Sequence, residues 1–207
     1  MTSPAMSNPG AREPALDLPR TGGGVREPGW WGMLLFCVTE SSLFLYLLGS
    51  YFYLRGTVAA FSAEGGRHSS LVTPVVLTVL LLSSSATLRW GELGIRRGDV
   101  RRLVIGLSAT LALGSVFLSL QLVEFARLEH LPQSDAYWSM FYTITGFHGA
   151  HVFLGLLMLA MNLVRALRGH FTASRYLAVQ NGSLYWHTVD IVWIAIVSIL
   201  YLAPHLW

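Results

Sequence analysis

Five apolar stretches, each long enough to cross a membrane as a helix, constrain this chain more than any other feature of its sequence. A hydrocarbon core of roughly 30 Å needs about 20 helical residues to span it. Charged residues make up only 12% of the chain, well below the roughly 25% of soluble domains. The sequence therefore predicts an all-α polytopic membrane bundle of five transmembrane helices. The predicted helices cover residues 30–54, 71–90, 104–125, 138–164 and 184–204.

The first 29 residues form a segment of different character. They are rich in Pro and Gly, carry mixed charges and contain no apolar run. They therefore lack the hydrophobic middle region of a cleavable signal peptide. This composition is typical of disorder, so we expect a disordered tail ahead of a membrane domain over residues 30–207.

The distribution of basic residues predicts the orientation. All fourteen are Arg, and with a cytoplasmic N-terminus only Arg55, Arg67 and Arg127 fall on the outer side. The other eleven then lie inside, as the positive-inside rule requires. We therefore expect a cytoplasmic N-terminus and tail, and a C-terminus outside. Because topology accounts for the basic charge, no nucleic-acid partner is expected.

Glu40 is the costliest residue of the first predicted helix. It follows Trp30 by ten residues, which places it about 15 Å deep, near the bilayer centre. Acids at this depth are expensive and are candidates for function. Two interpretations stay open: a proton-linked group in or beside a proton path, or a neutral acid hydrogen-bonded to a neighbouring helix.

The last three predicted helices each carry two polar residues three positions apart, a spacing that puts both on one helix face. The simplest arrangement points all three faces inward, where interhelical hydrogen bonds would fix the packing. No catalytic residue is predicted. The pairs are Gln121 and Glu124, His148 and His151, and His187 and Asp190.

A metal site is the sharper alternative, because His, Glu and Asp are metal ligands. Depth argues against it. His148 and His151 lie near mid-membrane, whereas His187 and Asp190 follow the predicted helix start by three and six residues, within roughly 10 Å of the inner surface. Ligands of one zinc-like ion must all lie about 2.0 to 2.2 Å from it. We therefore predict that the chain binds no metal.

Four segments, in this order along the chain, resemble one known family. They read WGMLLFCVTE over residues 31–40, FLSLQLVEF over 117–125, TGFHGAHV over 145–152 with Gly155 after it, and YWHTVDIVW over 185–193. Together they resemble subunit III of the haem-copper terminal oxidases, the cytochrome c oxidase type. The similarity runs from about Trp30 to Leu202, and the chain matches the five-helix bacterial form, which lacks two N-terminal helices.

The resemblance implies a non-redox accessory subunit in the bacterial plasma membrane. In this family haem and copper are held by subunits I and II, while subunit III carries no cofactor, binds lipid and supports the stability and proton uptake of subunit I. Glu40 would be the buried acid on the subunit I side. The bundle's polar interior would comprise Gln121, Glu124, His148, His151, His187 and Asp190.

Other functions remain open. The electron donor of the oxidase would be either cytochrome c or a quinol, and homologues associated with nitric oxide reductases share the five-helix form. Glu40 and the mid-depth histidines also fit a stand-alone proton or solute carrier, although five helices without an inverted repeat disfavour one. A membrane metalloenzyme is the third class of function, after an oxidase subunit and a carrier.

Overall fold

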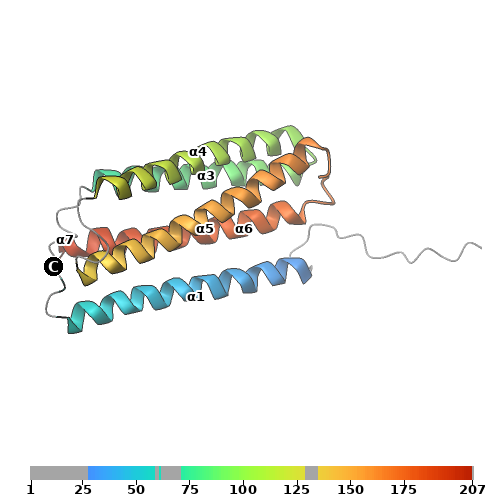
Figure 1. The fold of residues 1–207 in the computed structure, drawn as a ribbon. Helices are drawn as coiled ribbons and strands as arrows, with labels where there is room; N and C mark the ends of the chain where they lie inside the picture. Colours follow the sequence, from blue (N-terminus) through green and yellow to red (C-terminus); the bar gives the residue numbers. More distant parts are fainter. Residues whose placement is uncertain (1–27, 59–60, 62–70, 129–134, 207) are drawn as a thin grey trace, which may run out of the picture.

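The computed structural model describes residues 28–58, 61, 71–128 and 135–206, and it forms a bundle of long helices (Figure 1). Five of them are long and apolar enough to cross a membrane, so the predicted fold class is confirmed. The orientation of the termini remains a prediction. The helices are α1 (Pro28–Thr57), α3 (Val72–Ile95), α4 (Val100–Arg127), α5 (Ala136–Leu167) and α6 (Leu177–Ile196), the last continued by η1 (Val197–Leu202) and α7 (Ala203–Leu206).

Two helix ends differ from the prediction in ways that matter for the site. Helix α3 continues to Ile95, five residues past the predicted end, and α6 begins at Leu177, seven residues before the predicted start. Both extensions contain polar residues, which hid them from a search for apolar runs. The predicted disordered tail lies outside the described residues, apart from Pro28 and Gly29, which open α1.

Local signals set the turn between α3 and α4 and the start of α5. Gly98, at a φ of +81°, makes the tight turn between α3 and α4, a conformation that glycine adopts without steric cost. Asp99 then caps α4 by accepting a hydrogen bond from the Arg102 amide at 3.0 Å. Asp135 caps α5 in the same way through the Tyr137 amide. Such caps satisfy amides that have no partner within the helix.

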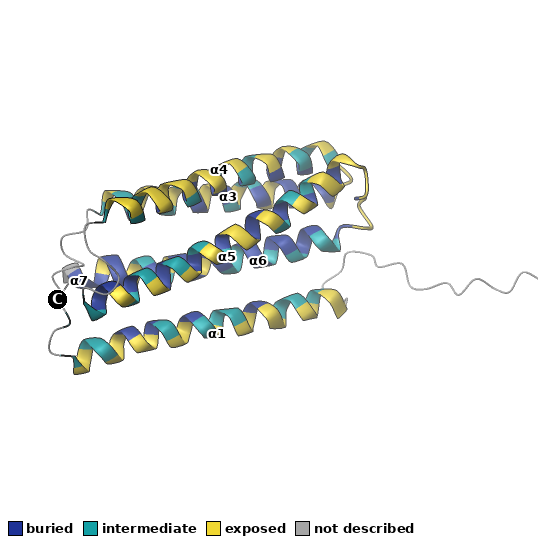
Figure 2. Ribbon diagram, in the orientation of Figure 1, coloured by how far each residue is buried: buried dark blue, intermediate teal, exposed yellow. Residues whose placement is uncertain are grey.

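The helices pack in a defined order. Helices α3 and α4 form a close antiparallel pair, α5 and α6 lie against this pair, and α1 rests on the outer side of α6 and α5 (Figure 1). Large apolar side chains such as Leu35, Leu45 and Tyr46 are exposed on α1 (Figure 2). Continuous exposure of this kind fits a hydrocarbon environment.

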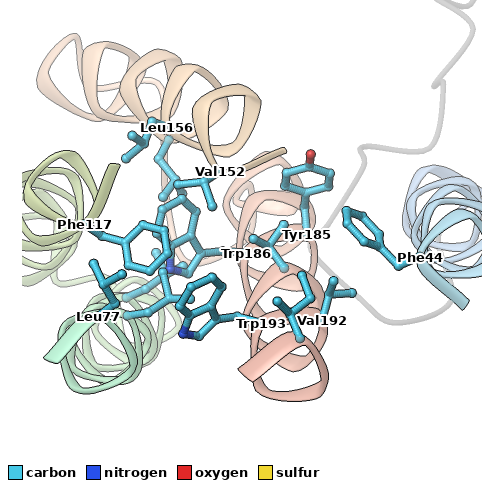
Figure 3. Close-up of a cluster of buried hydrophobic side chains, with 14 of the residues drawn as sticks. Phe44, Leu77, Phe117, Val152, Leu156, Tyr185, Trp186, Val192 and Trp193 are labelled. Carbon is cyan, nitrogen blue, oxygen red and sulfur yellow. The ribbon is translucent and has the colours of Figure 1, made fainter. Parts of the chain in front are cut away.

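Aromatic side chains fill the centre of the bundle. Trp186 and Trp193 project from α6 and are fully buried, and Phe117 of α4 meets the Trp193 ring edge-on at 5.0 Å (Figure 3). Both indole N–H groups are satisfied by α3, through Ser84 at 3.0 Å and Thr78 at 3.0 Å. This packing fixes the rotation of α6, and with it the directions in which the polar residues of α6 point.

Candidate functional site

Glu40 and His151 form a pair between α1 and α5. Glu40 Oε2 lies 2.9 Å from His151 Nε2, and His151 Nδ1 lies 2.7 Å from the Phe147 carbonyl oxygen. Because a carbonyl only accepts, Nδ1 carries a hydrogen and donates it. The Nε2–Oε2 contact then requires one further proton, which either partner can carry. The pair lies about 18 Å along the helix from the start of α1.

A small cavity of about 10 Å³ adjoins this pair, close to the volume that one water molecule needs. His148 lines it and is fully buried, with its ring stacked on Trp193 at 5.0 Å. Neither His148 ring nitrogen has a hydrogen-bond partner among the described residues. The other lining residues are Cys37, Glu40, Ser41, Phe44, His151, Tyr185, Thr188, Val189 and Val192.

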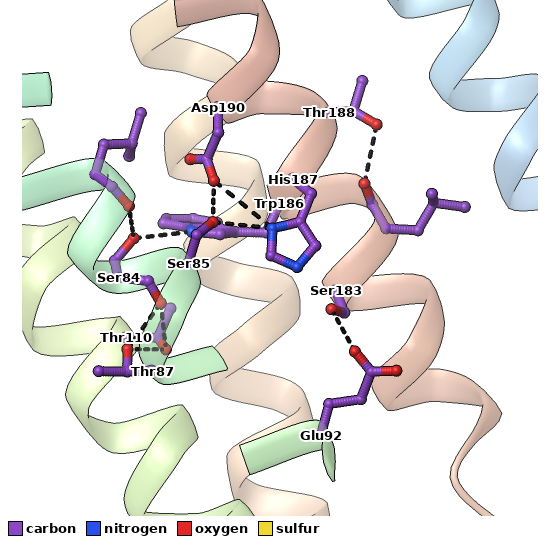
Figure 4. A network of polar contacts seen from close by, with 12 residues as sticks. Ser84, Ser85, Thr87, Glu92, Thr110, Ser183, Trp186, His187, Thr188 and Asp190 are labelled. Atoms are coloured by element: carbon purple, nitrogen blue, oxygen red, sulfur yellow. Dashed lines mark hydrogen bonds and ion pairs between the residues drawn. The ribbon is translucent and has the colours of Figure 1, made fainter. Parts of the chain in front are cut away.

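His187 and Asp190 form a second cluster, with Ser85 of α3 (Figure 4). The Ser85 hydroxyl donates to Asp190 Oδ2, and its oxygen lies 2.9 Å from His187 Nδ1. Since the hydroxyl donates to the acid, it accepts from Nδ1–H of the imidazole. Asp190 is buried and His187 is partly exposed. Ser85 therefore joins α3 to α6 at this level.

A third cluster centres on Glu92, which the sequence analysis missed because it follows the predicted end of its helix. The buried Glu92 carboxylate accepts from Ser183 of α6 at 2.8 Å (Figure 4). It also accepts from Arg96 at 2.6 Å and from Arg89 at 3.2 Å. The signal that could have found it is the spacing Arg89, Glu92, Arg96, which puts two cations on the helix face of one acid.

Gln121 and Glu124 lie near the C-terminal end of α4. Both are close to Tyr201 in η1, and Gln121 is buried. The six residues predicted to share one polar interior thus occupy different helix contacts. His151 faces α1, His187 and Asp190 face α3, and Gln121 and Glu124 adjoin the C-terminal turns.

The separation of these clusters has a different cause from the one predicted. Because α6 begins at Leu177, His187 lies ten residues into the helix, about 15 Å deep, so its depth approaches that of Glu40. What separates the His187–Asp190 cluster from the Glu40–His151 pair is the side of α6 that each adjoins. Within the described ranges, no three His, Cys, Asp or Glu side chains lie close enough together to hold a metal ion.

Comparison with known proteins gives one consistent family. The family model for cytochrome c oxidase subunit III matches residues 23–207. The chain is 36% identical to cytochrome c oxidase subunit 3 of Thermostichus vulcanus, over 83% of this chain and 85% of that protein. It is 37% identical to the Synechocystis sp. subunit 3, over 83% of this chain and 74% of that protein. It is 36% identical to the Corynebacterium diphtheriae subunit 3, over 82% and 85%.

The match spans all five membrane helices and includes the segments that carry Glu40, the two histidines of α5, and the His187–Asp190 pair. It agrees with the resemblance found in the sequence. This chain therefore belongs to the cytochrome c oxidase subunit III family.

Proposed function

We propose that this chain is the non-redox accessory subunit III of a proton-pumping haem-copper terminal oxidase, which reduces oxygen to water in aerobic respiration. The observation that supports this proposal is the family match over residues 23–207. In this proposal subunits I and II hold the haem and copper, and this chain supports the stability and proton uptake of subunit I. It lies in the bacterial plasma membrane with its N-terminus in the cytoplasm, and bound phospholipid accompanies it.

Co-purification tests the proposal. A tagged copy, extracted from its own membrane in mild detergent, should bring with it a large haem-binding membrane chain and a visible haem spectrum. A colourless and solitary protein would overturn the proposal. The electron-donor domain of the co-purified chains then distinguishes a cytochrome c oxidase from a quinol oxidase.

The Glu40–His151 pair is the part of the chain that best fits a role in proton uptake. It lies near the middle of α1, brings Oε2 and Nε2 to within 2.9 Å of each other, and has a glutamate side chain that is 30% exposed. A water-sized cavity adjoins it. These features support an exchangeable proton rather than a sealed structural contact.

We expect Glu40→Ala to leave assembly of the oxidase intact but to make its activity decay several-fold faster during turnover. The reason is that the substitution removes the ionisable group while deleting one contact at a partly exposed position. The measurement is oxygen consumption over many turnovers, with haem content as the assembly control. Glu40→Gln keeps the shape of the side chain and should decay like Glu40→Ala. Loss of assembly in both variants would show that the pair is structural.

A further inference from the structure

Helix α1 is the most exposed of the membrane helices. Of its most apolar stretch 17% is buried, against 28% to 44% in the other four helices. Lipid tails are as apolar as its side chains, so packing and hydrogen bonds hold such a helix in place. Its polar contacts therefore matter more for its attachment than its apolar area does. The residues that α1 buries are Cys37, Phe44, Leu48 and Tyr51, on the side that packs against α5 and α6.

The Glu40–His151 contact attaches α1 to α5 only while it contains a proton. His151 Nδ1 donates to the Phe147 carbonyl oxygen at 2.7 Å, so Nε2 of the neutral ring is an acceptor. The facing Glu40 Oε2, 2.9 Å away, is an acceptor too when it is ionised. One proton on either atom makes a hydrogen bond, and a second proton leaves that bond in place. Without a proton, a carboxylate and a ring lone pair face each other and repel.

The other ionisable side chains beside the pair cannot replace that proton. They are Cys37 on α1, His148 on α5 and Tyr185 on α6. Ionisation of Cys37 or Tyr185 would add a further negative charge. The His148 ring is fully buried, where an unpaired positive charge is costly. The state of the Glu40–His151 contact therefore depends on its own proton.

We propose that the docking of α1 on α5 and α6 is controlled by protonation: α1 is held while the Glu40–His151 contact keeps its proton and loosens when that proton leaves. Docking is thus favoured at lower pH and weakened as the pH rises. The small cavity lies between these helices and is lined from both sides, by Cys37 of α1 and by Tyr185 and Val192 of α6, so loosening exposes it. The inference goes beyond the proposed function, because it concerns contacts within this chain and requires no partner.

The chain carries its own reporter for this movement. Cys37 is its single cysteine, is 3% exposed and lies three residues before Glu40 on the docked side of α1. In the full chain in lipid nanodiscs, the rate at which N-ethylmaleimide modifies Cys37 should rise with pH several-fold more steeply in the wild type than in Glu40→Gln. Thiolate formation increases with pH in both proteins, so the ratio of the two rates isolates the movement.

Glu40→Gln is the matched control because its amide N–H can donate to His151 Nε2 whether or not a proton is available. It also removes the negative charge beside Cys37. That change favours the thiolate in the variant and so works against the expected difference. Equal pH dependence in the two proteins would overturn the proposal. His151→Leu, which removes the acceptor, should be modified at a rate several-fold above that of Glu40→Gln even at low pH, and circular dichroism checks that it is folded.

A distance measurement tests the movement without relying on thiol chemistry. Spin labels replace Tyr46 of α1 and Leu154 of α5, which are 78% and 54% exposed, in a Cys37→Ala background. The distance between the labels should lengthen or broaden as the pH rises, and with Glu40→Gln added it should stay constant. A constant distance in both proteins overturns the proposal. Equal broadening in both also overturns it, because the bundle would then loosen for a reason other than this proton. Co-purification of a haem-bearing chain is independent of either result, so the proposed function is tested separately.

Discussion

Gly106→Ala should separate α3 from α4 and lower the free energy of unfolding by about 2 to 3 kcal/mol, in the range of overpacking a tight contact. A Cβ on Gly106 would lie 2.8 Å from Gly91 Cα, 2.8 Å from the Thr87 carbonyl oxygen and 3.0 Å from the Gly91 nitrogen. All three are backbone atoms and cannot rotate away. The helices must move instead, and the Thr87–Thr110 contact at 2.9 Å moves with them.

Gly146→Ala is the matched control, because a Cβ there meets nothing within 4 Å. It lies in another long helix and gains the helix propensity of Ala, about 1 kcal/mol over Gly. We expect it to be neutral or stabilising. The measurement is the unfolding midpoint of the full chain in mixed micelles, followed by circular dichroism. Similar losses of stability in the two variants would mean that α3 and α4 do not approach as closely as the Gly91–Gly106 contact requires.

Small residues could be predicted as sites of tight packing, but their partners could not. Gly114 and Gly155 lie on different helices, and a Cβ on either would come within 3.0 Å of the same Trp186 ring. The sequence shows that both faces are small, yet it does not reveal that an indole from a third helix fills the space. Partner choice depends on the rotation of α6, which long-range packing determines.

For the polar residues, too, the sequence identifies the residues but not the partners that they contact. Spacing in the sequence predicts that His187 and Asp190 share a helix face, and in the structure both contact the Ser85 hydroxyl. Nothing in the sequence distinguishes Ser85 from its neighbours Ser83 and Ser84, because a serine in a membrane helix usually bonds to its own backbone. Similarly, nothing local distinguishes His151, which meets Glu40, from His148, which packs among aromatic rings.

Depth was the least predictable property. Apolar length fixes the number of helices, but a helix end that contains polar groups cannot be recognised from hydropathy. In this chain Ser183 and Glu92 lie in such ends, and the Ser183 hydroxyl donates a hydrogen bond to the Glu92 carboxylate across the α3–α6 contact. An error of seven residues in the start of α6 changed the inferred depth of His187 by about 10 Å.

Glu92→Ala should destabilise the chain by about 2 to 3 kcal/mol, because it removes a buried polar contact between α3 and α6. The carboxylate is buried and accepts from two guanidinium groups and the Ser183 hydroxyl. Hydrogen bonds to charged groups contribute about 1.5 to 3 kcal/mol each where they are buried. Arg89 and Arg96 are partly exposed, so solvent weakens their share, and the buried Ser183 contact accounts for much of the loss.

Two control variants separate these contributions. Arg89→Ala removes only the longer and more exposed contact and should cost less than about 0.5 kcal/mol. Glu92→Gln keeps an oxygen for Ser183 but removes the charge, so it should fall between Arg89→Ala and Glu92→Ala. The same unfolding measurement in mixed micelles ranks all three. If Arg89→Ala proved as damaging as Glu92→Ala, the ion pair rather than the buried interhelical hydrogen bond would hold this end of the bundle together.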